Sequence, residues 1–413
     1  MDTLSAAAAV ALVLLALHLV FRVISPCSIR FTAFSDAQTL VPLRHSPDDA
    51  GSRDHLGGHR NEEAHPLCVA VTGGVGFLGG AIVRQLASRG TLKIRVLDAH
   101  QPPEGRLRGV EYVDVDLVAD DPTKFLVGVD AVIHVAGVVG MRASQAAHLH
   151  NVHVVATRKL VRAARLAGVR MLVATSSTAA VTSPYCTASQ LRLPSEFMPA
   201  ADFPFANAYS KTKFAAERIA LAANDPRGFA VVALRLPGLY GVGDRTLVDA
   251  LLSGKLTHAP AGRDGSAPTI DFCYVENAAH AHCVALDALC QRRSDIAGSS
   301  FNVSDGEAET RPAFDIWNLL LVACAPQGTA PRVVKPLPYA VAYVAACIFE
   351  LVDWFLVGRV PFPRAPMWGL TRASLGFATT PITLQLSPAL RYTPLYTTQQ
   401  AFAHIAKQWR ART

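Results

Sequence analysis

Cysteine pairs, charge and basic clusters are all scarce in this sequence. None of its eight cysteines lies in a C-x-x-C pair, which argues against a zinc ribbon or a thioredoxin-type motif and favours reduced thiols. Charged residues make up only 17% of the chain and apolar residues 51%, the opposite of the balance that keeps a chain disordered. No basic stripe with interleaved aromatics is present, so nucleic acid is a poor partner. The composition therefore predicts a large folded protein.

A run of 19 residues without a formal charge, TLSAAAAVALVLLALHLVF, lies near the N-terminus. As a helix it would span about 28 Å, close to the thickness of a bilayer core. Asp2 stands where a cleavable signal peptide would carry positive charge, and Arg22 follows the run. We interpret residues 1–27 as an uncleaved anchor that leaves the rest of the chain in the cytosol, with a cleaved signal peptide as the alternative. Residues 28–66 are polar and irregular and are expected to form a tether.

Strand-like and helix-like segments alternate from residue 67 onwards. Short apolar runs such as LCVAVT and DAVIHVAG are separated by helical patterns, the longest from Ala143 to Ala167. Strands that are apolar throughout are typical of a parallel sheet covered on both faces. We predict an α/β fold, a Rossmann-type doubly wound parallel sheet, over residues 67–236. Residues 237–413 break the alternation and are expected to form a smaller substrate-binding region.

A second apolar stretch, LPYAVAYVAACIF, lies in this C-terminal region. Glu350 and Asp353 follow it too soon for a comfortable membrane span. For residues 337–356 we expect a helix that lies on the membrane surface or dips into it. An ordinary buried helix is the alternative.

A glycine-rich turn, TGGVGFLG, joins the first predicted strand to the first predicted helix. Gly73, Gly76 and Gly79 would let the backbone turn tightly and approach a pyrophosphate. The helix N-terminus at Phe77 and Leu78 would favour the negative charge of that group. The position of this turn at the start of an alternating α/β domain predicts a dinucleotide cofactor, and a plain glycine turn is the alternative.

Carboxylates at two further strand ends fit the same cofactor. Asp98 ends the second predicted strand, 25 residues after Gly73, where it would accept hydrogen bonds from the adenosine ribose. Because a carboxylate repels a 2′-phosphate, NAD is favoured over NADP, although Asp98 could also be a simple turn residue. Asp116 and Leu117 end the third predicted strand and are expected to hold the adenine.

Tyr209 and Lys213 form a Y-x-x-x-K pattern, which places a phenol and an ammonium on one face of a helix. A tyrosine pKa near ~10 is too high for a base at neutral pH, and a nearby cation favours the phenolate. Ser177, at the end of the fifth predicted strand, would donate a hydrogen bond to the substrate oxygen. We therefore predict Ser177, Tyr209 and Lys213 as catalytic residues, with Tyr209 and Lys213 also contacting the cofactor. A plain surface helix is the alternative.

Together these motifs resemble the extended short-chain dehydrogenases/reductases. The resemblance is carried by T-G-G-x-G-F-L-G, the strand-end S-S, Y-x-x-x-K and L-R-L-P-G-L-Y-G. The block DFCYVEN, from Asp271 to Asn277, resembles the 3β-hydroxysteroid dehydrogenase family. YGVGDR and YVENAAHAH look most like the branch of sterol-4α-carboxylate 3-dehydrogenases (decarboxylating). The resemblance covers about residues 67–410.

The resemblance implies NAD-dependent oxidation of the 3β-hydroxyl of a sterol, with Tyr209 as the base. A substrate with a 4α-carboxylate would give a β-keto acid that loses CO2, as in C4 demethylation during sterol biosynthesis. The implied partners are a sterol or steroid and, with the predicted anchor, the lipid bilayer. We expect the endoplasmic reticulum membrane, with the catalytic domain facing the cytosol. A homodimer is left open.

Three other functions share these motifs. A 3β-hydroxysteroid dehydrogenase/Δ5-4 isomerase would release no CO2. A nucleotide-sugar epimerase or reductase would need cations for a second diphosphate, with Arg235, Arg245 and Arg263 as candidates. A non-catalytic NAD-binding membrane scaffold would have no use for the three predicted catalytic residues. No metal site is predicted, because the clustered histidines at positions 148, 150 and 153 have no acidic ligand beside them and are expected to be surface or core residues.

Overall fold

The computed structural model describes residues 66–411, apart from short gaps. These gaps lie at 103–104, 141–144, 183–190, 200–202, 204, 206, 263–264, 266–268, 307–310, 327, 329 and 357–381. The predicted anchor, residues 1–27, and all but the last residue of the predicted tether, residues 28–66, lie outside the described residues. Within the described part of the chain, no helix is long and apolar enough to cross a membrane.

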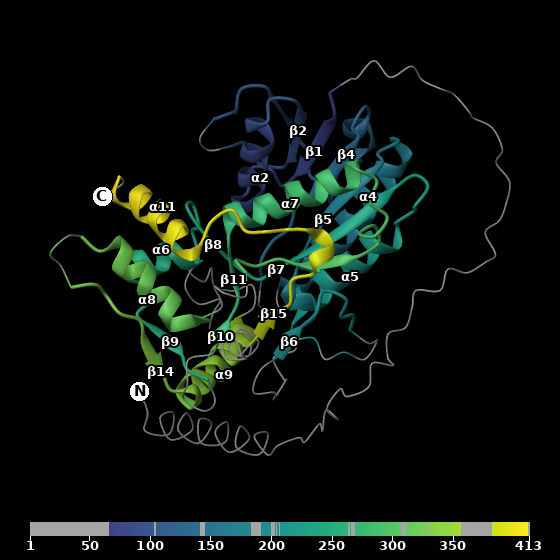
Figure 1. Cartoon of the computed structure of the whole chain (residues 1–413). Coiled ribbons are helices and arrows are strands. Elements are labelled where there is room, and N and C mark those ends of the chain that lie inside the picture. Colours follow the sequence, from purple (N-terminus) through teal and green to yellow (C-terminus); the bar gives the residue numbers. More distant parts are fainter. Residues whose placement is uncertain are drawn as a thin grey trace, which may run out of the picture. The chain divides into compact units, whose positions relative to one another are not determined.

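Seven parallel strands form the main sheet, in the order β12-β7-β5-β4-β1-β2-β3 (Figure 1). The strands are β1 (Cys68–Thr72), β2 (Lys93–Asp98), β3 (Val110–Asp114), β4 (Ala131–His134), β5 (Met171–Ser177), β7 (Ala230–Leu236) and β12 (Ser300–Asn302). This arrangement confirms the predicted Rossmann-type sheet. The strand order reverses between β1 and β4, and in such sheets ligands bind beyond the carboxyl ends of the strands at this switch point.

Alternate residues of the strands face two separate cores, because successive side chains point to opposite faces of a sheet. Val69 and Val71 of β1 pack in the core formed with α2 and α7, whereas Ala70 packs in the core formed with α4 and α5. Figure 1 shows these helix pairs on either side of the sheet. The four helices are α2 (Phe77–Ser88), α4 (Ala156–Leu166), α5 (Ala208–Ala222) and α7 (Val275–Cys290).

The long helical pattern predicted from Ala143 to Ala167 is present but not uniform. It begins with α3 (Ala146–Leu149), widens into a π-helical turn (His150–Val155) and continues as α4. Such π-helical turns are rare in proteins, and those that occur often lie at functional sites. This one brings His153 towards α5, where its ring contacts Thr212.

Residues after position 237 contribute to the main sheet as well as to a smaller region. Both α7 and β12 lie in this part of the chain and complete the Rossmann unit. The other elements of the described chain are short or peripheral. They are β6 (Leu191–Leu193), β8 (Gly238–Tyr240), α6 (Leu247–Leu252), β9 (His258–Pro260), β10 (Thr269–Ile270), β11 (Phe272–Tyr274), β13 (Arg311–Pro312), α8 (Ala313–Cys324), β14 (Lys335–Leu337), α9 (Tyr339–Leu356), β15 (Ile382–Leu384), α11 (Thr398–Arg410) and 3₁₀ turns at Pro122–Leu126, Thr178–Ala180 and Pro388–Leu390.

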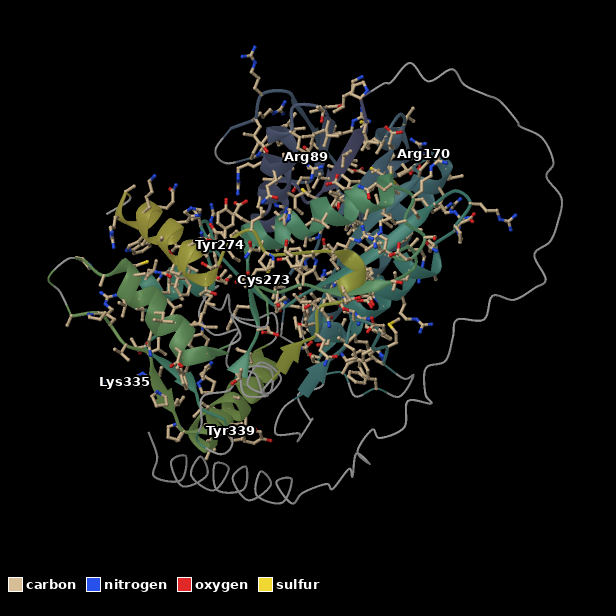
Figure 2. The ribbon with its side chains drawn as sticks, in the orientation of Figure 1. Arg89, Arg170, Cys273, Tyr274, Lys335 and Tyr339 are labelled. Atoms are coloured by element: carbon tan, nitrogen blue, oxygen red, sulfur yellow. The ribbon has the colours of Figure 1, made fainter. Side chains whose placement is uncertain are left out.

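A buried carboxylate, Asp305, ties this region to the main sheet just after β12. It accepts hydrogen bonds from the Tyr240 hydroxyl at 2.7 Å, the Tyr274 N–H at 2.8 Å and the Asn277 side chain at 2.7 Å. Tyr274 lies at this junction in the middle of the molecule (Figure 2). Since a buried charge needs several donors, this cluster fixes the end of β8, the end of β11 and the start of α7 together.

Candidate active site

The glycine-rich turn lies at the switch point between β1 and β4. Gly73 has a φ of +67°, and a Cβ there would lie 2.7 Å from Ala136 Cα, which follows β4. At Gly79 a Cβ would clash with the carbonyl oxygen of Gly73. Gly76 is the N-cap of α2 and has no side chain to cover the first N–H groups of the helix. These glycines therefore leave the N-terminus of α2 open to a pyrophosphate. The turn that they form fits a dinucleotide cofactor.

The two residues that begin α2 have different environments. Leu78 is buried in the core, so only its backbone can face a cofactor. Phe77 is half-buried, and its ring lies beside Gly243 of the segment that follows β8. Both residues thus start the helix as predicted, with Leu78 anchoring the turn to the sheet.

Asp98 ends β2 as predicted, and its carboxylate is turned towards the glycine turn. It accepts hydrogen bonds from the Val75 N–H and from the His100 N–H, both at 3.0 Å. The side chain is 12% exposed, and the His100 ring lies 3.4 Å away. The carboxylate therefore holds the turn in place and keeps a partly exposed edge, and its contact with the ribose stays a prediction.

The predicted end of the third strand was placed too late. β3 ends at Asp114, and the chain then enters a turn. In this turn the Asp116 N–H donates to the Asp120 carboxylate at 2.9 Å, so it cannot continue the pairing of the strand. Asp116 is exposed and its carboxylate accepts the Val118 N–H at 2.8 Å, whereas Leu117 is a core residue. Their role in holding adenine stays a prediction.

Ser177, Tyr209 and Lys213 converge at the carboxyl end of β5. Ser177 is the last residue of β5, and its hydroxyl interacts with the phenol of Tyr209 and acts to lower the pKa of that phenol. Tyr209 and Lys213 lie one turn apart on α5, whose first turn is capped by the Asn207 side chain. The Lys213 ammonium donates to the Thr175 carbonyl oxygen at 3.4 Å. The structure thus brings together the three residues predicted to be catalytic.

Burial dominates the protonation of this cluster. It raises the pKa of the Tyr209 phenol, and the hydrogen bond with Ser177 acts in the opposite direction. Burial also lowers the pKa of the Lys213 ammonium to about 8, although the Glu217 carboxylate one turn further along α5 opposes this. The expectation that Lys213 by itself lowers the pKa of the phenol is therefore not met. Lys213 still carries its charge at neutral pH, since its pKa lies above 7.

The lowered pKa of Lys213 predicts a loss of activity in alkaline solution. An ammonium is charged below its pKa, so the fraction of protein with a charged Lys213 falls as the pH rises through about 8. We expect kcat to fall in the same range. A pH profile of Lys213→Arg is the matched comparison, because guanidinium stays charged and the alkaline decline should then disappear from whatever activity remains. An unchanged alkaline decline in this variant would contradict the assignment.

The sequence analysis missed His153 as a neighbour of the candidate active site. Its ring meets that of Tyr209 edge to face, with centroids 5.6 Å apart. It is 2% exposed, so it is a core histidine as the sequence analysis expected. In the described residues, no group of three or more metal-ligating side chains could hold a metal ion. The helical spacing of the histidines could not reveal the contact with Tyr209, because α5 lies more than 50 residues further along the chain.

Arg235, a candidate for binding a second diphosphate, is fully buried and paired. Its Nη2 lies 2.6 Å from Oε1 of Glu217, and both side chains are 0% exposed. Nε also donates to the Glu217 carboxylate at 3.1 Å, Nη1 donates to two backbone carbonyl oxygens, and Nη2 also contacts the sulfur of Met198. Arg235 is therefore a structural residue. Arg245 is exposed, and Arg263 lies outside the described residues.

With the geometry established, comparison with known proteins identifies the family. A family model described as the 3-beta hydroxysteroid dehydrogenase/isomerase family matches residues 70–339. The chain belongs to this family. It is accordingly an oxidoreductase. This confirms the family and the enzyme class predicted from the motifs. The family also confirms the predicted cofactor, NAD.

Two curated relatives show how varied the substrates are. The 2-alkyl-3-oxoalkanoate reductase of Stenotrophomonas maltophilia is 35% identical over 311 residues, covering 72% of this chain and 87% of the relative. The sterol-4-alpha-carboxylate 3-dehydrogenase, decarboxylating, of Mus musculus is 30% identical over 289 residues, covering 68% of this chain and 74% of the relative. Both are reductases or dehydrogenases by name, in agreement with the family.

A solved structure confirms the fold. MoeE5 in complex with UDP-glucuronic acid and NAD is 21% identical and superposes with a TM-score of 0.60. The match covers 83% of this chain and 99% of MoeE5. At this identity the likeness establishes the architecture only, and it leaves the substrate to be argued from the site.

Proposed function

We propose that this protein oxidises the 3β-hydroxyl of a sterol with NAD, that the sterol carries a 4α-carboxylate, and that CO2 is lost. The observation that carries the proposal is the convergence of Ser177, Tyr209 and Lys213 beside the glycine turn of β1. The similarity to the sterol-4-alpha-carboxylate 3-dehydrogenase of Mus musculus supports the sterol. Gly73, Gly76 and Gly79 would hold the pyrophosphate, and Asp98 the ribose.

The three side chains divide the oxidation between them. Tyr209, as phenolate, takes the proton of the 3β-hydroxyl, while Ser177 donates a hydrogen bond to the same oxygen. Lys213 keeps a positive charge at neutral pH one turn from Tyr209 on α5, where it would contact the cofactor ribose. NAD, when bound, supplies the hydride acceptor for the C3 hydrogen, and its positively charged ring favours the phenolate.

Decarboxylation needs no further catalytic group from the protein. Once C3 is a ketone, the carboxylate on C4 belongs to a β-keto acid. The bond between C4 and the carboxylate carbon breaks, its electron pair moves into the ketone as an enolate, and CO2 leaves. The enolate then takes up a proton. Tyr209, which holds the proton removed earlier, stands beside the ketone oxygen and can return it there.

A second candidate is the reduction of a 2-alkyl-3-oxoalkanoate. It is favoured by the 35% identity to the Stenotrophomonas maltophilia reductase. By their names, this substrate and the 4α-carboxysterol share one arrangement, a carboxylate on the carbon next to a carbinol or ketone carbon. The same three side chains serve either direction, since a phenol returns the proton that a phenolate removes. The two candidates therefore differ in the apolar framework and not in the reacting atoms.

Purified full-length protein distinguishes these candidates directly. It is incubated with NAD and a 4α-carboxysterol, and NADH and CO2 are followed together. A second incubation contains NADH and a 2-alkyl-3-oxoalkanoate, and a third contains NAD and a Δ5-3β-hydroxysteroid without a carboxylate. Equal amounts of NADH and CO2 in the first incubation are the expected result.

Each other outcome selects a different function. NADH without CO2, or turnover of the Δ5-steroid to a Δ4-3-ketone, overturns the decarboxylating assignment in favour of the dehydrogenase/isomerase. Turnover only in the second incubation selects the alkanoate reductase. No turnover in any incubation, with NAD binding retained, favours a scaffold. The internal pairing of Arg235 with Glu217 removes one of the cations that a nucleotide-sugar enzyme would need.

We also propose attachment to the endoplasmic reticulum membrane, with the bilayer supplying the sterol. The uncharged N-terminal run supports an anchor. On α9, Val341 and Ile348 are each 54% exposed. Tyr339, labelled in Figure 2, begins the helix, and its ring stacks on that of Tyr343. Exposed apolar side chains with nearby tyrosines are typical of a helix at a membrane surface. Recovery of the expressed chain in alkaline-washed microsomal membranes is expected, and its recovery in the supernatant would overturn this proposal.

A further inference from the structure

His153 occupies an unusual position in the helix that precedes β5. It lies within the π-helical turn His150–Val155, where the backbone widens and the ring turns inwards. Burial lowers the pKa of His153 to about 3, and the positive charge of Lys213 acts in the same direction. His153 is therefore a neutral imidazole at physiological pH, and both of its nitrogens must be satisfied by hydrogen bonds.

The two ring nitrogens of His153 bond to different parts of the site. Nδ1 lies 2.9 Å from the hydroxyl oxygen of Thr212, which is located on α5 between Tyr209 and Lys213. Nε2 lies 3.0 Å from the backbone carbonyl oxygen of Val138, in the turn that follows β4. The ring thus joins the helix that carries the phenol to the turn at the switch point of the sheet.

Space around the ring is limited on the remaining sides. The Tyr209 ring packs against it at 5.6 Å, with an interplanar angle of 76°. A Cβ on Gly137 would lie 3.6 Å from His153 Nε2 and 3.2 Å from the Lys213 ammonium. Gly137 is therefore a close neighbour of both side chains, and the imidazole fills the space between the phenol and the turn after β4.

We propose that His153 is a positioning residue for the proposed dehydrogenase reaction, fixing the Tyr209 phenol and the turn after β4 relative to one another. This inference rests on the proposed function, in which Tyr209 is the base. Without the imidazole, the phenol would lose its edge contact and Thr212 would lose a partner. The interaction of the Ser177 hydroxyl with the phenol, which acts to lower the phenol pKa, would then be less well maintained.

Other ionisable groups face the same space and enter any pH profile. Besides burial, the charges of Lys213, His134 and His148 lower the pKa of His153. His134 is fully buried, and burial lowers its pKa to about 3. The two buried histidines are therefore neutral across the pH range in which the Tyr209 phenol ionises. A change of kcat with pH in that range reports on the phenol and on Lys213.

The test uses full-length His153→Phe and His153→Gln. Phenylalanine keeps a ring against Tyr209 but removes both hydrogen bonds, and glutamine keeps an amide at the distance of Nε2. The matched control is His282→Phe. His282 is also fully buried and also bonds to a threonine hydroxyl, Thr175 at 2.9 Å, and to a backbone carbonyl oxygen at 2.7 Å. In the described structure it lies on α7, across the sheet from α5.

The measurements are kcat, the KM for NAD and the pKa of the Tyr209 phenol. The phenol pKa is read from the ultraviolet difference spectrum between each protein and its Tyr209→Phe counterpart. For His153→Phe we expect kcat to fall by roughly 10²-fold, as for other misplaced catalytic groups, with the KM for NAD within about twofold. The phenol pKa should rise, and His153→Gln should recover part of both effects.

Two results would overturn the inference. One is a phenol pKa and a kcat in His153→Phe that match those of the wild type. The other is an equal change in His282→Phe, which would mean that loss of any buried histidine has the same effect. If His153→Phe does not fold, Thr212→Val removes the same link from the other side and takes its place. Failure of the proposed function is recognised separately, since Tyr209→Phe would then leave turnover intact.

Discussion

Replacing Tyr209 by phenylalanine is expected to lower kcat by roughly 10²- to 10⁴-fold, the usual contribution of a general acid or base. The phenol is buried and interacts with the Ser177 hydroxyl, and Lys213 lies on the next turn of α5. The KM for NAD should change little, because the glycine turn and Asp98 are untouched. The measurement is steady-state turnover of the proposed 4α-carboxysterol with NAD.

The matched control is Tyr392→Phe. Tyr392 is also a buried tyrosine, and its hydroxyl donates to the Ser304 carbonyl oxygen at 3.1 Å, away from the glycine turn. Its loss should leave kcat near that of the wild type and lower only the free energy of unfolding, by about 1 kcal/mol. If Tyr209→Phe retains full activity, or if the two variants lose activity alike, the phenol does not act as the base.

Much of this site could be predicted from the sequence because its parts are local. The glycine turn lies between a strand and a helix, and the Y-x-x-x-K spacing is a property of one helix. Both are read from neighbouring residues, and the parallel sheet then carries them to one edge. The strand end at Ser177 follows from the same reasoning, since its apolar run stops there. These predictions depended on short-range patterns and on one rule of sheet topology.

The remaining features depend on contacts between distant segments. The strand β12 is only three residues long, and it joins the sheet because β7 has a free edge next to it. The contact of His153 with Thr212 and Tyr209 joins residues more than 50 positions apart. The pKa of Tyr209 depends on how deeply the phenol is buried, a quantity that spacing does not contain. A pattern gives the chemistry of a side chain but not its surroundings.

Replacing Glu217 by glutamine is expected to lower the free energy of unfolding by about 3–5 kcal/mol, the usual cost of breaking a buried ion pair. Glutamine keeps the size of the side chain, but it removes the charge and turns one acceptor oxygen into an NH2 donor. The Arg235 guanidinium would therefore stay buried without a counter-ion, and one of the donors that Glu217 now accepts, from Arg235 or Ser176, would lose its acceptor. Chemical denaturation, monitored by fluorescence, measures the change.

The exposed pair of Arg89 and Asp287 provides the control for this prediction. Its closest N–O distance is 2.7 Å, but the two side chains are 32% and 47% exposed, so Asp287→Asn should cost less than about 1 kcal/mol. An equal cost for both variants would mean that the Glu217 pair is not held in a low-dielectric interior. Glu217→Gln should also lower the pKa of Lys213 below about 8, because the carboxylate raises it. The alkaline decline of kcat should then begin at a lower pH, linking the buried pair to the Lys213 ammonium.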